Sequence, residues 1–196
     1  MGNLWSVRSA VSYLGYNPII SSSRQEIENA NALILPGVGS FRSAMQALQD
    51  SGLDKAILEG VSNKQHKILG ICLGMQLLAM QSTEGGETKG LGLIPTKVER
   101  FDHNISDNLK VPHIGFNEVR REKQSILFKD ISQLSAFYFV HSYCLHPDNL
   151  KGLNAICHYG QDFLAAYEYE NIFATQFHPE KSQTNGLKLL KNFLEY

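Results

Sequence analysis

A strand, a sharp turn and a helix in the middle of the chain constrain the fold more than any other feature. An apolar run at 68–71 is typical of a buried strand, and 75–80 is typical of a helix. Between them, Gly70-x-Cys72-x-Gly74 matches the cysteine version of a nucleophile elbow. Such an elbow strains the backbone of its nucleophile, and only small neighbouring residues avoid a clash there. The pattern predicts a catalytic cysteine on a sharp turn.

The helix that follows this turn favours a reactive sulfur. Its free N–H groups point back at Cys72 and stabilise the thiolate relative to the thiol. The alternative is that Cys72 is a small residue of the core, because cysteine is often fully buried. The two flanking glycines and the switch from strand to helix favour catalysis.

Strands and helices alternate through the first half of the chain. The expected elements are a helix at 4–14, strands at 18–21 and 32–35, and helices at 41–48, 53–61 and 75–80 around the strand at 68–71. Ser40 is placed to cap the helix at 41–48. This alternation predicts an α/β fold, a doubly wound, mostly parallel sheet flanked by helices, as in flavodoxin-like proteins.

The pattern changes after Gly90, where short strands are separated by turns. They are expected at 91–94, 96–101, 111–119, 137–140, 154–159, 163–168 and 172–177, before a closing helix at 187–194. Their spacing suits hairpins and predicts an antiparallel extension of the sheet. The stretch at 102–110 is polar and is expected to be a surface loop. Without a repeat or a linker, residues 1–196 are expected to form a single domain.

Charge and cysteine content exclude several classes of function. A net charge of −1 gives no electrostatic basis for binding nucleic acid or an anionic membrane. The three cysteines, Cys72, Cys144 and Cys157, are odd in number and form no C-x-x-C motif. They indicate a reducing compartment rather than disulfides or a zinc site. With no apolar run as long as a membrane span and no signal peptide, we expect a cytoplasmic protein without a metal or cofactor.

A cysteine nucleophile needs a base and a group that orients this base. Among seven histidines, His178 directly follows the strand expected at 172–177. Sites in open α/β sheets lie beyond the carboxyl ends of parallel strands, where the Cys72 turn must also lie. Glu180, two residues further on, can reach the other ring nitrogen of His178. The alternative is a capped strand end with a surface glutamate.

A glycine-rich loop, Pro36-Gly37-Val38-Gly39, follows the strand expected at 32–35. Two glycines around Val38 allow a backbone N–H to point into a cleft. The N–H of Leu73 would then be the other donor of an oxyanion hole. A plain turn before a helix is an equally good interpretation of this loop.

Together these motifs resemble the class I glutamine amidotransferases and, more narrowly, the HisH-type subunits of imidazole glycerol phosphate synthase. The resemblance spans essentially the whole chain and is carried by the blocks PGVG at 36–39, GICLGMQ at 70–76, GLGLIP at 90–95, VPHIGFNE at 111–118, YFVHSY at 138–143 and QFHPEKS at 176–182.

The resemblance implies a triad that hydrolyses the side-chain amide of glutamine through a γ-glutamyl thioester. It implies a catalytic set of Cys72, His178 and Glu180, an oxyanion hole of Val38, Gly39 and Leu73, and substrate binding by Gly37, Gln76, His141, Ser142 and Tyr143. It also implies a heterodimer with a HisF-type cyclase, a (β/α)8 barrel that receives the ammonia through a tunnel. The cyclase forms imidazole glycerol phosphate and AICAR in histidine biosynthesis. Asn3, Phe116 and Lys181 would lie at this interface.

The chain departs from the family pattern in three places. It begins at Met1-Gly2-Asn3, inside the Gly-x-Gly-Asn turn of the family, so that the first family strand is expected to be missing. Phe116 replaces the usual tryptophan, and Cys157-His158-Tyr159-Gly160 replaces the usual Thr-Glu-Tyr-Gly. Similar variation occurs in HisH-like glutaminases that supply sugar amidotransferases of surface-polysaccharide synthesis. That acceptor stays open, as do a γ-glutamyl cysteine hydrolase or peptidase and a non-catalytic scaffold.

Overall fold

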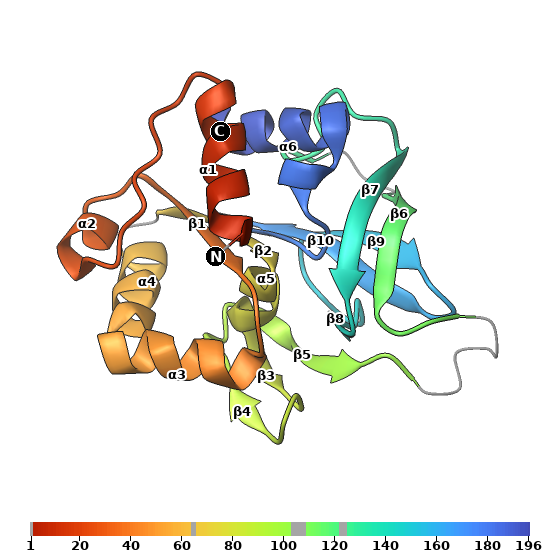
Figure 1. Ribbon diagram of the computed structural model, residues 1–196, viewed down its shortest axis with the longest axis horizontal. Helices are drawn as coiled ribbons and strands as arrows, with labels where there is room; N and C mark the ends of the chain where they lie inside the picture. The colour runs from red at the N-terminus through yellow and green to blue at the C-terminus, as the bar shows by residue number, and fades with distance from the viewer. Residues whose placement is uncertain (1, 64–65, 103–108, 122–124) are drawn as a thin grey trace.

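The computed structural model describes residues 2–63, 66–102, 109–121 and 125–196, with only the backbone described for residues 2 and 3. Its centre is a seven-stranded sheet in the order β1-β2-β11-β10-β9-β6-β7 (Figure 1). The strands are β1 (Ala32–Gly37), β2 (Lys67–Cys72), β6 (His113–Arg120), β7 (Leu134–His141), β9 (Leu153–His158), β10 (Asp162–Tyr169) and β11 (Ile172–Thr175). β2 pairs in parallel with β1 and with β11, and the other four pairings are antiparallel.

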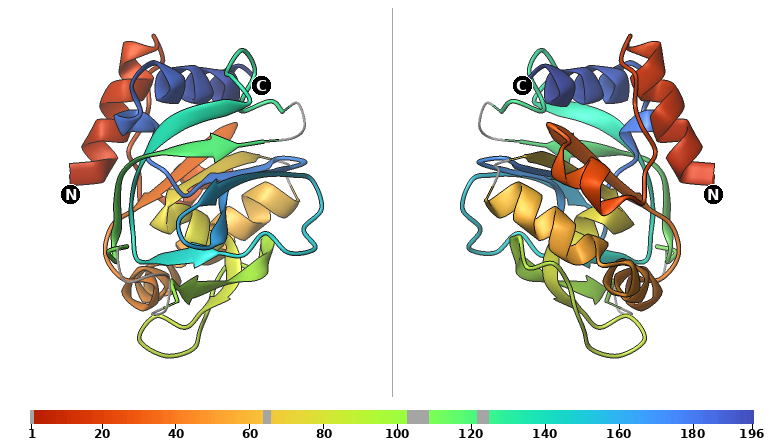
Figure 2. Two further views of the ribbon diagram at one scale, coloured as in Figure 1. Left: turned by 90° about the vertical axis from the view of Figure 1, so that its right-hand side faces the viewer. Right: turned by 90° about the vertical axis from the view of Figure 1, so that its left-hand side faces the viewer.

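Helices cover both faces of this sheet, as Figures 1 and 2 show. The helices are α1 (Gly2–Tyr13), α2 (Arg24–Glu28), α3 (Phe41–Ser51), α4 (Leu53–Ser62), α5 (Leu73–Leu78), the single 3-10 turn η1 (Pro179–Lys181) and α6 (Gln183–Glu195). Successive residues of β2 point to opposite layers. Leu69 and Ile71 pack in the core with α1 and α6, whereas Ile68 packs with α3, α4 and α5.

A second, smaller sheet lies beside α5. It has the order β4-β3-β5-β8 and consists of β3 (Ala79–Ser82), β4 (Thr88–Lys89), β5 (Ile94–Arg100) and β8 (Tyr143–Leu145). β8 follows β7 after a single residue, Ser142, so the chain passes directly from the main sheet to the small one. The segment 141–143 is thereby held between two sheets.

The structure confirms the α/β class, both helical layers and the antiparallel extension. Among the described strands of the main sheet, parallel pairing is confined to β1, β2 and β11, which is a smaller share of this sheet than we expected. Ser40 caps α3 as predicted, because its hydroxyl accepts a hydrogen bond from the N–H of Ser43. The loop expected at 102–110 falls mostly outside the described residues. No helix in the described part of the chain is both long and apolar enough to cross a membrane.

Four expected elements were wrong, in whole or in their bounds. The stretch 18–21 is not a strand, and Ile19 is largely exposed because no neighbouring strand pairs with it. The helix expected to reach 80 ends at Leu78, where N–H groups of 90–92 bond the carbonyls of Leu77, Ala79 and Met80. The strands expected at 91–94 and 96–101 are one strand, β5, which begins only at Ile94.

β1 forms one edge of the main sheet. Among the described strands it pairs only with β2, and all six of its residues are only partly buried. From the sequence we expected the first family strand to be missing and the sheet to have a gap in its place, and this stays a prediction. The assignment of residues 1–196 to a single domain also stays a prediction.

Candidate active site

Cys72 occupies a strained turn between β2 and α5. Its backbone has φ +55° and ψ −111°, a conformation that residues other than glycine rarely adopt. Cys72 is the last residue of β2, and Leu73 is the first residue of α5. The sulfur therefore lies at the carboxyl end of a parallel strand and in front of a helix, as the sequence predicted.

Two glycines make this turn possible, because a side chain at either position would collide with the backbone. A Cβ atom on Gly74 would lie 1.7 Å from the carbonyl oxygen of Leu35 in β1. A Cβ atom on Gly70 would lie 2.8 Å from the amide nitrogen of Met75. Glycine at 74 lets α5 approach β1 closely, and this approach fixes the position of the Cys72 turn.

His178 and Glu180 lie just beyond β11, within reach of Cys72. The Cys72 sulfur interacts with the His178 side chain closely enough to raise the pKa of the imidazole, and His178 Nδ1 lies 2.9 Å from Glu180 Oε1. The side chains of His178 and Glu180 are 3% and 0% exposed. The structure thus brings Cys72 into one buried row with His178 and Glu180, which lie more than a hundred positions further along the chain.

A buried hydroxyl holds the backbone of His178 in place. Ser182 Oγ donates to the carbonyl of His178 at 2.6 Å and accepts from the N–H of Tyr138 at 2.9 Å. The N–H of His178 donates in turn to the carbonyl of Tyr138 at 2.9 Å. Strand β7 therefore anchors the segment that follows β11, although the sequence pattern alone gave Ser182 no role.

The electrostatic environment of His178 favours its charged form. Burial lowers its pKa, but hydrogen bonds and charge interactions with Cys72 and Glu180 outweigh this effect and raise the pKa to about 9. At neutral pH the imidazole is therefore protonated. A protonated imidazole next to a cysteine sulfur can stabilise a thiolate and can later give up its proton.

A cavity of about 640 Å³ opens beside Cys72 and His178. Every residue predicted for the oxyanion hole or for substrate binding lines it, together with Lys181: Gly37, Val38, Gly39, Leu73, Gln76, His141, Ser142 and Tyr143. Val38 in the loop at 37–39 is 60% exposed. Gly39 in the same loop has φ +102°, a backbone conformation that favours glycine. Glu84, Pro112 and Val140 also line the cavity, and the sequence analysis did not single them out.

The family model of class I glutamine amidotransferases ("Glutamine amidotransferase class-I") matches residues 2–196. The chain belongs to this family. The amidotransferase is 43% identical over 197 residues to "Imidazole glycerol phosphate synthase subunit HisH 1" of Parasynechococcus marenigrum (strain WH8102), covering 100% of this chain and 94% of that protein. It is 45% identical over 196 residues to "Imidazole glycerol phosphate synthase subunit HisH" of Chlorobaculum tepidum, covering 100% and 96%.

A solved structure of a glutamine amidotransferase shares the fold. Its TM-score is 0.74 at 19% sequence identity, covering 99% of this chain and 93% of that chain. At this identity the likeness concerns the fold alone. The sheet and helices of this amidotransferase are therefore arranged as in that solved structure.

Two glutamines connect the Cys72 sulfur to the segment 141–143. Gln176 Nε2 donates to Cys72 Sγ at 3.7 Å, and Gln176 Oε1 accepts from Gln76 Nε2 at 3.0 Å. Gln76 Nε2 also donates to the carbonyl of Tyr143 at 2.9 Å. Gln176 was quoted as part of a family block but given no role, because only the fold shows that its amide faces the sulfur.

A buried pair of histidines supports the same segment in the amidotransferase. His141 Nδ1 lies 2.9 Å from the carbonyl of Tyr143, so this nitrogen must carry a proton. The other nitrogen, His141 Nε2, accepts a hydrogen bond from the N–H at His113 Nδ1 at 3.2 Å. His113 Nε2 in turn accepts from Asn117 Nδ2 at 3.4 Å. The chain of bonds requires both imidazoles to be neutral.

The neutral pair makes the stability of the amidotransferase sensitive to acid. Burial lowers the pKa of His113 from 6.5 to about 4 and that of His141 from 6.5 to about 3. As the pH falls below about 6.5, the unfolded chain binds protons that the folded protein excludes. We expect the free energy of unfolding to fall by up to about 1.4 kcal/mol per pH unit for each histidine. Urea denaturation between pH 4 and pH 7 measures this slope.

His178 acts in the opposite direction, because its pKa is raised. Its contribution to stability is complete below about pH 6.5 and is lost as the pH rises toward about 9.

His113→Asn tests the neutral pair and should reduce the loss of unfolding free energy between pH 7 and pH 4. His158→Asn, at a side chain that is 72% exposed, is the matched control and should leave this acid arm of the pH profile unchanged. An unchanged acid arm in His113→Asn would contradict the neutral pair.

The residues predicted for a partner interface lie partly together. Phe116 is 51% exposed on β6, and its ring meets the edge of the Tyr138 ring at 5.5 Å. Lys181 Nζ lies 5.9 Å from the centre of the same Tyr138 ring. With the exposed Ile114 and Leu134, these residues form what we call the β6–β7 patch (Ile114, Phe116, Leu134, Tyr138 and Lys181). The side chain of Asn3 lies outside the described part of the chain.

Metal-binding side chains do not gather in the described ranges. No group of three histidine, cysteine, aspartate or glutamate side chains there could hold an ion. The remaining cysteines, Cys144 and Cys157, are free and buried away from the cavity lining.

Proposed function

We propose that this amidotransferase is the glutaminase subunit of imidazole glycerol phosphate synthase. It hydrolyses glutamine to glutamate and ammonia and passes the ammonia to a cyclase subunit in histidine biosynthesis. The full-length similarity to proteins named HisH supports the assignment. The observation that carries the chemistry is the buried row of Cys72, His178 and Glu180 beside a cavity of about 640 Å³.

The reaction begins with an ion pair of thiolate and imidazolium. Cys72 Sγ attacks the amide carbon of glutamine and forms a tetrahedral intermediate. His178 gives its proton to the amide nitrogen, and the carbon–nitrogen bond breaks. Ammonia departs, and the glutamyl group stays on Cys72 as a γ-glutamyl thioester. His178 then takes a proton from water, whose oxygen attacks the thioester. Glutamate leaves, and thiolate and imidazolium are restored. Glu180 orients His178 through Nδ1, and no step requires a cofactor.

Backbone N–H groups stabilise the oxyanion in this scheme. The N–H of Leu73 belongs to the first turn of α5, next to Cys72, where a helix offers it no carbonyl partner. The loop of Val38 and Gly39, which lines the same cavity, supplies the second donor. Both donors belong to the backbone, so their position depends on the turn at Cys72 and on the glycines around it.

We assign substrate binding to residues 141–143 and to Gln76, which line the cavity. Both ring nitrogens of His141 are engaged within the protein. We therefore assign His141 the role of holding the backbone of Ser142 and Tyr143, which contacts the glutamine. Gln76 uses its amide nitrogen for Tyr143 and Gln176, which leaves its carbonyl oxygen for a donor group of the substrate.

The β6–β7 patch is the proposed site of the cyclase, a HisF-type (β/α)8 barrel in a heterodimer. Lys181 belongs both to this patch and to the wall of the cavity. A partner seated on the patch would cover the mouth of the cavity and receive ammonia before bulk water protonates it. The patch is apolar and aromatic with a cationic edge, which suits the core of an interface. We further propose a cytoplasmic location, where a biosynthetic synthase has its substrates.

Reconstitution with a cyclase subunit tests the function. Glutamate release from glutamine should be slow for the isolated chain and should rise strongly with the cyclase and its nucleotide ligand, together with imidazole glycerol phosphate and AICAR. Stimulation by a sugar-modifying enzyme instead would assign the ammonia to surface-polysaccharide synthesis. Activity on γ-glutamyl peptides with none on glutamine would show a different cysteine hydrolase.

The proposed interface predicts that the Phe116 side chain contributes strongly to binding of the cyclase. Phe116→Ala removes an exposed aromatic ring from the centre of the β6–β7 patch, and aromatic anchors of this kind often contribute about 2 kcal/mol to binding. We expect the affinity for the cyclase to fall about 30-fold by calorimetric titration. Ile19→Ala, at a side chain that is 79% exposed between α1 and α2, is the control and should bind as the parent does. Equal loss in both variants would argue against this patch.

A further inference from the structure

The sulfur of Cys72 needs hydrogen-bond donors when it carries a negative charge. Cys72 is only 8% exposed, so the protein must supply most of these donors in place of bulk water. His178 interacts with the sulfur from the side of the triad. The carbonyl oxygen of Val140 also lies 3.9 Å from the sulfur, where it can accept from a thiol but cannot donate to a thiolate. A second donor would therefore favour the charged form.

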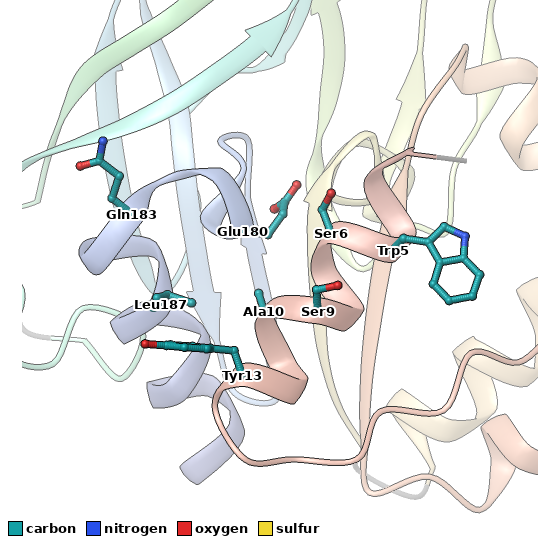
Figure 3. Close-up of a pocket in the computed structure, with 8 residues that line it drawn as sticks. All are labelled: Trp5, Ser6, Ser9, Ala10, Tyr13, Glu180, Gln183 and Leu187. Atoms are coloured by element: carbon teal, nitrogen blue, oxygen red, sulfur yellow. The ribbon is translucent and has the colours of Figure 1, made fainter.

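Glu180 does not contact the sulfur itself. It lies at the other end of the catalytic row, where it lines a groove formed with α1 and α6 rather than the cavity of Cys72 (Figure 3). Its carboxylate therefore acts on Cys72 through His178. A side-chain N–H group that contacts the sulfur directly belongs instead to Gln176, whose Nε2 atom lies 3.7 Å from Cys72 Sγ.

The backbone of Gln176 is held firmly at the end of β11. Its N–H donates to the carbonyl of Ala165 in β10 at 2.8 Å, and its side chain is fully buried. The ring of the next residue, Phe177, stacks on Phe137 in β7 with the ring centres 4.1 Å apart. The side chain of Gln176 therefore reaches Cys72 from a backbone that two other strands hold in place.

The hydrogen bonds fix which end of the Gln176 amide faces the sulfur. The carbonyl of Tyr143 can only accept, so the atom of Gln76 that lies 2.9 Å from it must be the amide nitrogen. The second hydrogen of this nitrogen donates to the carbonyl oxygen of Gln176 at 3.0 Å. Because its oxygen is engaged there, Gln176 presents its amide nitrogen to Cys72 Sγ. The contact at the sulfur is thus a donor.

We infer that Gln176 is a catalytic residue whose side-chain N–H stabilises the Cys72 thiolate. The sulfur is charged before it attacks the amide carbon and again when the thioester breaks and the thiolate departs, so the donor acts at both stages. Through Gln76, the same two amides hold the segment 141–143 at a fixed distance from the nucleophile. The inference rests on the proposed glutaminase function, and it adds a donor that belongs neither to the triad nor to the oxyanion hole.

The pH dependence of Cys72 alkylation by iodoacetamide tests the inference in the isolated chain. The reagent reacts with the thiolate, so the pH of half-maximal rate reports how strongly the protein stabilises this form. Gln176→Met replaces the donor with an apolar side chain of similar length and should move this midpoint up by about one pH unit. Gln176→Glu keeps the shape of the side chain but places a carboxylate next to the sulfur, and it should move the midpoint further.

Gln161→Met is the matched control. Gln161 Nε2 lies 3.7 Å from the sulfur of Cys144, which is the same kind of contact, and neither residue lines the cavity of Cys72. This variant should keep the parental midpoint for Cys72. In the complex reconstituted with the cyclase it should also keep the parental kcat, whereas Gln176→Met should lower kcat about 10-fold, because the thiolate leaves the thioester without its donor.

Two results would overturn the inference. One is an unchanged midpoint in a Gln176→Met protein that thermal unfolding shows to be folded. The other, decisive if neither Gln176 variant folds, comes from nuclear magnetic resonance of the parent protein. There the side-chain N–H signals of Gln176 should shift with the alkylation midpoint, and signals that do not move with pH contradict the contact. Alkylation needs no turnover, so a parent complex that releases no glutamate refutes the proposed function alone.

Discussion

Replacing Cys72 with alanine should abolish glutaminase activity, with a fall in kcat of at least about 10⁴-fold. Removal of the nucleophile leaves only substrate binding and the oxyanion donors, and residual rates of this kind are small in other triads. The fold should be retained, since alanine at 72 loses one sulfur atom and keeps the Cβ atom that the turn accommodates. Glutamate release in the reconstituted complex measures the effect, and circular dichroism checks the fold.

The other two cysteines provide matched controls for this experiment. Burial raises the pKa of Cys144 and of Cys157 to about 12, so that neither thiol ionises at neutral pH. Cys144→Ala and Cys157→Ala should therefore keep the parental kcat. Iodoacetamide, which reacts with thiolates, should label Cys72 alone and should inactivate the complex in step with labelling. Glutamate release by Cys72→Ala at the parental rate would exclude this residue as the nucleophile.

The sequence predicted the local parts of the site well. Gly70-x-Cys72-x-Gly74 specifies a strand, a turn and a helix through neighbouring residues, and the structure shows that each glycine is required by a short contact. His178 and Glu180 are likewise close in sequence, and their pairing needs only one turn of chain. Such patterns are readable because their physical cause lies within a few residues.

The parts that the sequence alone did not predict depend on contacts between distant segments. A small sheet joins β3, β5 and β8, because the chain leaves the main sheet at 141–143. The stretch at 18–21 has the composition of a strand but no neighbour with which to pair. His113 supports the segment 141–143 only because His141 lies opposite it in the β6–β7 pairing. Single-sequence patterns contain no information on such partners.

Substituting alanine for Gly74 should have the largest effect on folding. Its Cβ atom would lie 1.7 Å from the carbonyl oxygen of Leu35, and both groups belong to backbone that is fixed on several sides. Leu35 pairs with Gly70 in the parallel ladder, and α5 packs in the buried core between β1 and α3. Relief of the clash must therefore separate α5 from the sheet. We expect a loss of at least about 4 kcal/mol in unfolding free energy, which is the range of severe core disruptions.

Gly15→Ala is the matched control for this prediction. Gly15 has φ +90°, and a Cβ atom there would meet nothing within 4 Å, so the substitution costs only the backbone conformation, about 1 kcal/mol. Urea denaturation of both variants separates the cost of collision from the cost of conformation. The same collision would displace Leu73 and Cys72, so any folded Gly74→Ala protein should also release little glutamate. A Gly74→Ala variant as stable as Gly15→Ala would mean that α5 can retreat from β1, and the position of the nucleophile could not then depend on their contact.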